Sequence, residues 1–252
     1  MKNYGILLEY DGSNYYGWQK QDDYMSIQET LETILGDFFG TPIHLHGSGR
    51  TDRGVHAMGQ VANFMVESTI PGERLKYALN PKLPDDIAIR ASAEMPMDFH
   101  ARYSARGKTY IYRLYCSKER RPLYGNRYGH CQYPLDVELM QECAKDLLGT
   151  HDFNAFKSKR TELENTIRTI YKAEIRQCGE CLEFEFSGNG FMYNMVRIMT
   201  GTLIDIGRGF YEPGRIRELL ELKDRTKAGH TAPACGLYLQ EVRYEQKYFK
   251  NY

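Results

Sequence analysis

The chain has 252 residues, of which 42% are hydrophobic and 26% charged, and its 33 Lys and Arg balance 33 Asp and Glu. This composition is typical of a globular protein with one large or two small domains, and it excludes a uniformly basic nucleic-acid coat. No apolar run reaches the ~18 residues of a membrane-spanning helix. The six scattered cysteines predict free thiols in a reducing cytoplasm.

Charge is unevenly distributed along the chain. Residues 1–105 have a net charge of −5 and residues 106–252 a net charge of +5. Residues 101–130 contain eight cations, Arg120 and Arg121 among them, and a single acidic residue, Glu119. Six tyrosines are interspersed among these cations. Cations interleaved with aromatics are typical of surfaces that contact phosphates and stack on bases. The alternative is a solvated strand edge that carries Lys and Arg on its wet face.

The first half of the chain predicts elements in the order β-α-β-β-α-β. A strand over 4–10 precedes a helix that starts after Ser26, which has capping-box spacing with Glu29, and that stops at Gly40. The rest of this half is predicted as strands over 43–46, 58–66 and 86–92, with a short helix over 73–79.

The second half predicts the same order again. A helix over 136–148 and another marked by apolar residues from Met192 to Leu203 alternate with strands over 109–116, 167–176, 182–186 and 237–243, and an extra helix starts near Pro213. The predicted fold is therefore α+β, with two ferredoxin-like β-α-β-β-α-β halves, residues 1–105 and residues 106–252.

The connection between the strands at 43–46 and 58–66 is the first candidate for chemistry. It reads Gly47-Ser48-Gly49-Arg50-Thr51-Asp52-Arg53-Gly54-Val55-His56-Ala57, which is longer than a hairpin turn needs. Asp52 is its only carboxylate, and Arg50 or Arg53 can hold it ionised as a nucleophile. The alternative is an Asx turn flanked by solvated arginines. The segment does not match a nucleotide-binding phosphate loop, because Val55 and His56 occupy the positions where that motif requires Lys and Ser or Thr.

Other candidate sites carry weaker signals. Cys178 and Cys181 form a lone CxxC at a predicted hairpin turn, which favours an ordinary turn with two thiols over a metal site. His44 and His46 share a predicted strand face, but spacing supplies no third ligand, so we expect no metal. The methionines at 192–199 are typical of a core-facing helix.

Four segments of the chain carry specific motifs in a fixed order. The first is GRTDRGVHAMGQVANF, from Gly49 to Phe64, and the others follow at residues 106–113, 188–197 and 232–239. In these four segments and their order, the chain resembles the tRNA pseudouridine synthase A family, whose signature is similar to the first segment. The resemblance extends from near residue 5 to near residue 244.

The resemblance implies a fold, an activity and a set of site residues. Family members convert uridine to pseudouridine at positions 38, 39 and 40 of the tRNA anticodon stem-loop, without cofactor or metal, as homodimers with two RRM-like halves around a central cleft. By motif position, Asp52 matches the catalytic aspartate. The other matches are Tyr110 to a tyrosine that packs against the target base, Arg50 to an arginine linked to base flipping, Arg197 to a basic residue near the catalytic carboxylate, and Leu237 to an apolar wall of the uracil pocket.

The implied chemistry suits these residue types. The base must leave its stack, after which a carboxylate attacks either C6 of uracil or C1′ of ribose, and the sequence leaves both routes open. Arg53 departs from the small residue that is common in the family and adds a charge beside the nucleophile, so we expect it to contact RNA. Two alternative interpretations stay open. In these the chain is either a non-catalytic RNA-binding protein, although no RRM consensus strand is present, or a paralogue that modifies a different uridine.

Overall fold

The computed structural model describes residues 1–158 and 165–249 of the chain, which form an α+β structure, as the sequence predicts. The chain divides into two compact units. Unit 1 contains residues 1–106 and the chain from Leu239 onward, and unit 2 contains Gly107–Tyr238. The last strand, β10 (Leu237–Arg243), therefore begins in unit 2 and continues in unit 1. Within the described ranges, the helices are too short or too polar to cross a lipid bilayer.

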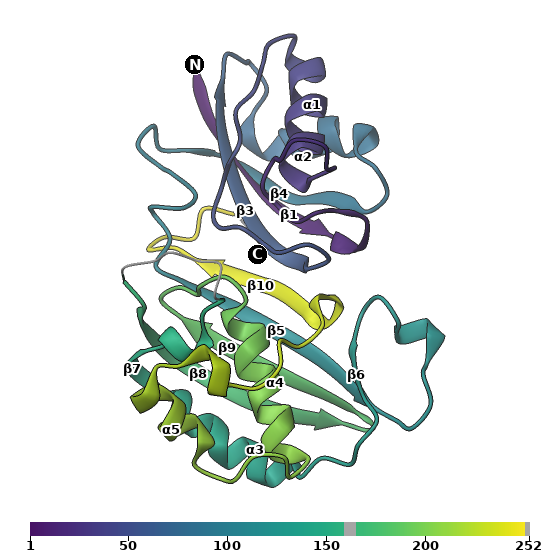
Figure 1. The fold of residues 1–252 in the computed structure, drawn as a ribbon. Coiled ribbons are helices and arrows are strands. Elements are labelled where there is room, and N and C mark those ends of the chain that lie inside the picture. Colours follow the sequence, from purple (N-terminus) through teal and green to yellow (C-terminus); the bar gives the residue numbers. More distant parts are fainter. Residues whose placement is uncertain (159–164, 250–252) are drawn as a thin grey trace. The chain divides into compact units, whose positions relative to one another are not determined.

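Unit 1 has the ferredoxin-like arrangement. Its strands follow the order β4-β1-β3-β10, β2 also pairs with β3, and β1 is antiparallel to both of its neighbours. Figure 1 shows both helices of this unit on one side of β1 and β4. The predicted order β-α-β-β-α-β is confirmed, with the elements β1 (Lys2–Tyr10), α1 (Ile27–Phe39), β2 (His46–Gly47), β3 (His56–Val66), α2 (Leu75–Leu79) and β4 (Ile87–Met95).

Local sequence fixes both ends of α1. The Ser26 hydroxyl accepts a hydrogen bond from the Glu29 amide at 3.2 Å, which satisfies one of the unpaired N–H groups of the first turn. At the other end Gly40 adopts a left-handed conformation (φ 69°) that caps the helix. Ile27, Leu31 and Leu35, spaced by one turn each, are buried against the sheet.

Strand β2 is shorter than predicted and begins later. The sequence predicts a strand over 43–46, whereas only His46 and Gly47 pair with β3. The cause is that side chains of α1 bind the backbone of Leu45: Glu32 Oε1 accepts from its amide at 2.9 Å, and Gln28 Nε2 donates to its carbonyl at 3.2 Å. With both groups satisfied, no neighbouring strand is needed there. His44 consequently lies outside any strand.

Unit 2 repeats the pattern with insertions. Its strands follow the order β5-β9-β8-β7, and the short β6 runs parallel to β5. Figure 1 shows the three helices of this unit on one face of the sheet. Cys178 and Cys181 are opposite each other in the strand register, on either side of the predicted hairpin turn. The elements are β5 (Gly107–Cys116), β6 (Gly129–Cys131), α3 (Val137–Ala144), β7 (Gly149–Asp152), β8 (Ile167–Cys178), β9 (Cys181–Gly188), α4 (Met195–Gly207) and α5 (Arg215–Leu222).

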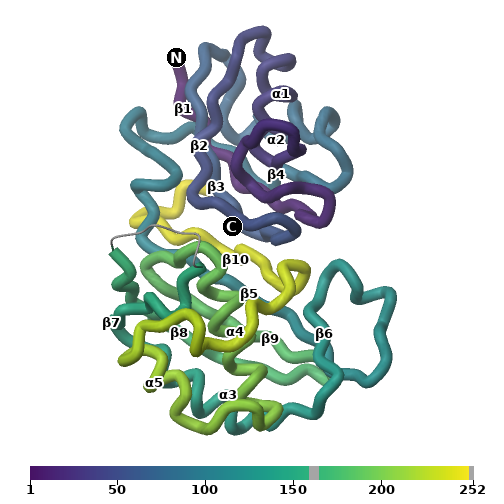
Figure 2. The backbone as a smooth tube through the Cα atoms, viewed as in Figure 1, coloured from purple at the N-terminus to yellow at the C-terminus, as the bar shows by residue number. Residues whose placement is uncertain are grey.

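Helix α4 begins later than its apolar pattern predicts. Met192 is buried but precedes the helix, because Asn194 takes a left-handed conformation (φ 61°) at the N-terminal boundary. Met195 and Met199 are fully buried, so the prediction that these methionines belong to the core is confirmed. Figure 2 shows a long connection between β5 and β6 that extends away from the sheet of unit 2; it carries Arg120 and Arg121.

Replacing Ser26 tests the cap of α1. We expect Ser26→Ala to lower the free energy of unfolding by about 1 kcal/mol, because it leaves the Glu29 amide without its partner. Urea unfolding followed by circular dichroism measures this shift. Thr33→Ala, at an exposed position of the same helix, is the matched control and should change stability by no more than about 0.5 kcal/mol. Equal stability of Ser26→Ala and the wild type would contradict the assigned cap.

Candidate active site

The loop between β2 and β3, residues 48–55, is fixed by backbone hydrogen bonds to the segment that follows β1. The amide of Trp18 donates to the carbonyl of Thr51 at 3.1 Å, and the amide of Gly54 donates to the carbonyl of Tyr15 at 3.3 Å. Within the loop, the amide of Val55 donates to the carbonyl of Asp52 at 3.1 Å. The backbone is therefore held on both sides of Asp52.

Glycines allow these two segments to come this close. A Cβ atom on Gly12 would lie 2.0 Å from the carbonyl oxygen of Val55, and one on Gly17 would lie 2.4 Å from that of Thr51. Gly17 also has a φ of 95°, which side-chain-bearing residues rarely adopt. Any larger residue at either position would displace the loop.

Side chains from the sheet hold the start of the loop. Tyr10 of β1 hydrogen-bonds through its hydroxyl to the Thr51 hydroxyl at 2.8 Å, and Gln60 of β3 donates to the carbonyl of Gly49 at 2.8 Å. Gln60 also accepts from the hydroxyl of buried Ser48. Burial raises the pKa of Tyr10 far above its usual value, so its phenol stays neutral and keeps its hydrogen bond to Thr51.

The two loop arginines contact side chains of the 15–25 segment. Arg50 donates from Nε to Gln19 Oε1 at 3.2 Å. The guanidinium carbon of Arg53 lies 4.0 Å from the ring centre of Tyr16. Both arginines are exposed, whereas Asp52 between them is half-buried. The loop thus presents a carboxylate between two anchored cations.

The remaining predicted catalytic and pocket residues lie in unit 2. Tyr110, on β5, is buried, and its ring meets that of Phe191 edge to face, with centres 5.2 Å apart. Leu237 is buried at the start of β10. Arg197, on the first turn of α4, is half-buried; it donates from Nε to the carbonyl of Ala232 at 2.7 Å and from Nη1 to Asn194 Oδ1 at 2.8 Å.

The segment that holds Arg197 lies directly on α4. A Cβ on Gly201 would lie 1.9 Å from the carbonyl oxygen of His230, and one on Gly229 would lie 2.6 Å from Cα of Thr202. The amide of Gly229 donates to the Thr202 hydroxyl at 3.1 Å. This close packing sets the position of Ala232, and therefore of the Arg197 side chain bonded to it.

Asp205 anchors the same segment from the far end of α4. Its carboxylate is almost fully buried, lies 3.1 Å from Nδ1 of His230 and forms a 2.9 Å ion pair with Arg208. Burial alone would raise the pKa of Asp205, but the bonds and charge of His230 together with the charge of Arg208 outweigh it and lower that pKa.

The basic segment of unit 2 is less positive than its sequence indicates. Arg121 forms a 2.7 Å ion pair with Glu180, and Arg113 lies 3.4 Å from Glu183. Arg120 and Arg121 are both exposed on the β5–β6 connection. Part of the local positive charge is therefore neutralised by carboxylates that the one-dimensional count does not include.

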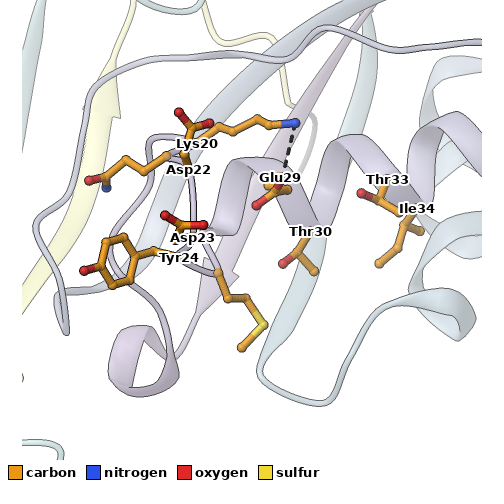
Figure 3. Close-up of a pocket in the computed structure, with 10 residues that line it drawn as sticks. Lys20, Asp22, Asp23, Tyr24, Glu29, Thr30, Thr33 and Ile34 are labelled. Atoms are coloured by element: carbon orange, nitrogen blue, oxygen red, sulfur yellow. Dashed lines mark ion pairs between the residues drawn. The ribbon is translucent and has the colours of Figure 1, made fainter.

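A separate open pocket of about 780 Å³ lies between the 20–25 turn and α1. Figure 3 shows the carboxylates of Asp22, Asp23 and Glu29 around it, with Lys20 paired to Glu29 at 3.3 Å. This acidic lining is unsuited to phosphate. Across residues 1–158 and 165–249, no three His, Cys, Asp or Glu side chains are grouped to hold a metal ion.

Several residues of these sites were not predicted from the sequence. Tyr16 and Gln19 hold the loop arginines, Phe191 packs on Tyr110, and Asn194 binds Arg197. Phe191 and Asn194 lie inside the third motif segment, so that segment contained a signal. Tyr16 belongs to an aromatic cluster, Tyr15-Tyr16-Gly17-Trp18, that stands out in composition but not in spacing.

Comparison with known proteins covers almost the whole chain. A family model described as tRNA pseudouridine synthase matches residues 6–104 and 143–245. The chain belongs to the tRNA pseudouridine synthase family. Enzymes of this family are isomerases that act on tRNA uridines, and the resemblance predicted from the four motif segments is thereby confirmed.

Individual relatives in the family are similar over their full length. The chain is 48% identical to tRNA pseudouridine synthase A of Acetivibrio thermocellus and 46% identical to that of Caldicellulosiruptor bescii, in each case over 97% of this chain and 100% of the relative. It is 46% identical to tRNA pseudouridine synthase A 2 of Clostridium tetani, over 96% and 99%.

We expect protonation of Asp205 at low pH to weaken its interactions with His230 and Arg208. Because the folded-state pKa of Asp205 lies below the ordinary value of 3.8, the ionised carboxylate stabilises the fold above about pH 4, and this contribution is lost as the pH falls through the folded-state pKa. We expect Asp205→Asn to lower the free energy of unfolding by about 1–3 kcal/mol at pH 7, with the gap to wild type narrowing below pH 4. Urea unfolding at pH 7, 5 and 3.5 measures the gap, with exposed Glu221→Gln as control. A constant gap would contradict this assignment.

Proposed function

We propose that this chain converts uridine to pseudouridine at positions 38, 39 and 40 of the tRNA anticodon stem-loop, with Asp52 as the nucleophile. The observation that carries the proposal is Asp52 itself, a half-buried carboxylate on a loop whose backbone is hydrogen-bonded on both sides of it. It is the only carboxylate between Gly49 and Ala57. A nucleophile fixed in this way needs little reorganisation before attack.

The reaction is an isomerisation that the side chains alone can support. The C1′–N1 glycosidic bond breaks, a C1′–C5 bond forms on the same base, C5 loses a proton and N1 gains one, so no co-substrate is consumed. The Asp52 carboxylate can form a transient ester with C6 of uracil or with C1′ of ribose. In either route the detached uracil must rotate in place, which requires a closed apolar surface around it.

Four other residues are proposed to act on the target nucleotide. Tyr110 offers an aromatic face to the uracil and Leu237 an aliphatic one, and both side chains are buried. Arg50 is proposed to occupy the space that the flipped base leaves, and the hydrogen bond from its Nε to Gln19 Oε1 restrains its side chain. Arg197 provides positive charge for the reaction from a side chain that two hydrogen bonds hold in place.

We propose that Arg53, Arg120 and Arg121 bind the tRNA backbone. All three are exposed. Arg121 shares its charge with Glu180 across an exposed ion pair, and such pairs exchange readily for phosphate because they contribute little to stability. Arg120 is therefore expected to contribute more to phosphate binding than Arg121.

The compartment, oligomeric state and partners that we propose follow from the family resemblance and from the free thiols. We propose a cytoplasmic homodimer that uses tRNA as its partner and needs no cofactor or metal. All six cysteines are free thiols in the structure, which supports a reducing compartment. The resemblance alone supports the dimer and the anticodon stem-loop specificity. The proposed division of labour assigns the nucleophile to residues 1–105 and additional RNA-binding surface to residues 106–252.

Replacing Asp52 tests the nucleophile. We expect Asp52→Asn to reduce pseudouridine formation by at least about a thousandfold, because an amide cannot attack, while tRNA affinity and the unfolding midpoint stay near wild type. Pseudouridine mapping at positions 38–40 of a tRNA transcript measures the product. Asp85→Asn, an exposed carboxylate of unit 1, is the control. A variant that keeps most of the wild-type rate would refute the assignment, and normal tRNA binding without turnover by the wild type would favour the RNA-binding alternative.

Removing the cations of the β5–β6 connection tests the backbone contact. We expect Arg120→Ala with Arg121→Ala to weaken binding to all tRNAs alike and to lower the salt slope of log K by about 0.7–0.9 for each lost phosphate contact. The single-turnover rate at saturating tRNA should change little, because neither side chain is among those proposed to touch the uridine. Filter binding at several salt concentrations measures the slope. Unchanged affinity at every salt concentration would show that this connection is only solvated surface.

A further inference from the structure

Three side chains beside Asp52 form a continuous stack. The guanidinium carbon of Arg53 lies 4.0 Å from the ring centre of Tyr16, and the ring of Tyr24 stacks on Tyr16 with centres 4.1 Å apart and planes 23° apart. Two groups this close to one ring centre must occupy its opposite faces. Tyr16 is therefore the middle layer, and Arg53 and Tyr24 are the outer layers.

The backbone fixes this stack relative to Asp52. The amide of Tyr16 donates to the carbonyl of Met25 at 2.9 Å, and Gln21 pairs with Tyr24 across the turn. On the other side, the neighbouring Tyr15 accepts from the amide of Gly54 at 3.3 Å. The Tyr16 ring consequently has a defined position beside the loop, and it restrains the Arg53 side chain, which would otherwise be a flexible exposed chain.

The stack has an acidic end and a cationic end. Tyr24 follows the exposed carboxylates of Asp22 and Asp23, which repel phosphate (Figure 3). At the opposite end, no side chain in residues 1–158 or 165–249 forms an ion pair with the exposed Arg53. Stacking uses the face of a guanidinium and leaves its N–H groups available along the edge, where they match the oxygens of a phosphate.

We propose that Tyr16 and Tyr24 position Arg53 to bind a backbone phosphate of the RNA next to the target uridine. Arg53 is adjacent in sequence to the proposed nucleophile, so a phosphate held there fixes the strand at the point where the base must leave its stack. Arg53 is the phosphate ligand and Tyr16 a positioning residue. This inference rests on the proposed function and adds to it the residues that orient the RNA strand.

The test measures tRNA binding without turnover. An unmodified tRNA transcript is titrated onto Asp52→Asn protein, alone and combined with Arg53→Ala, Arg53→Lys or Tyr16→Leu, at several salt concentrations. Arg53→Ala should weaken binding about five- to tenfold and lower the salt slope by about 0.7–0.9, because one phosphate contact is lost. Tyr16→Leu should weaken binding about two- to fivefold with an unchanged slope, because the charge remains but its restraint is lost. Arg53→Lys should fall between the wild type and Arg53→Ala, also with an unchanged slope.

Matched controls separate this role from simple bracing of the loop. Lys76→Ala removes another cation that lies over an exposed tyrosine of unit 1, with Nζ 5.0 Å from the ring centre of Tyr77, and should leave tRNA binding unchanged. Tyr16→Phe keeps the ring and should bind like the parent, even if Tyr16→Leu disturbs folding.

Two results would overturn the inference. In one, Arg53→Ala changes neither affinity nor salt slope. In the other, it lowers only the turnover of the otherwise wild-type enzyme, which is the result expected of a structural brace. Failure of the proposed function is a separate result, because it would appear as turnover by Asp52→Asn protein itself.

Discussion

The hydrogen bond from the Trp18 amide to the Thr51 carbonyl, with Gly17 packed against that same carbonyl, is the constraint on which the candidate site depends. It joins the segment after β1 to the loop before β3, and it places Gln19 and Tyr16 within reach of Arg50 and Arg53. A side chain at Gly17 would push the two segments apart. The position of the Asp52 backbone and the contacts of both arginines therefore depend on this backbone contact, together with the hydrogen bond from the Gly54 amide to the Tyr15 carbonyl.

In unit 2, too, closely packed backbone segments position a charged side chain. There, Gly201 and Gly229 allow the 228–232 segment to lie directly on α4, and the Arg197 side chain is held at Ala232 by that contact. In both units a charged side chain is positioned by two backbone segments in close contact, and in unit 1 the side chains of Tyr10 and Gln60 also hold the loop. Backbone contacts of this kind leave few alternative arrangements, which suits a reaction in which a detached base must be recaptured in one orientation.

The sequence predicts what depends on neighbouring residues and misses what depends on distant ones. Ser26 and Gly40 mark the ends of α1 because capping is local, and the four motif segments identify the family because their order is itself specific. The start of β2 is missed because Glu32 and Gln28, on another element, satisfy the backbone of Leu45. The contact of Tyr16 with Arg53 spans 37 positions along the chain and leaves no periodic signal. Likewise, the sequence overestimates the net positive charge around Arg121, because Glu180, which is remote in sequence, forms an ion pair with it.

The assignment of β10 to two units has a consequence for synthesis of the chain. Unit 1 joins residues 1–106 to the chain from Leu239 onward, so the strand beside β3, which starts at Leu237, is synthesised only after the residues of unit 2 that precede it. At ~5–20 residues per second, about 10–35 s separate the emergence of β3 from that of its partner. Until then, the edge of β3 beyond the short β2 has unpaired backbone groups, which is the kind of edge that pairs with other chains. The nascent first unit is thus exposed to misassembly while the second unit is being made, and its sheet is completed only once β10 has been synthesised.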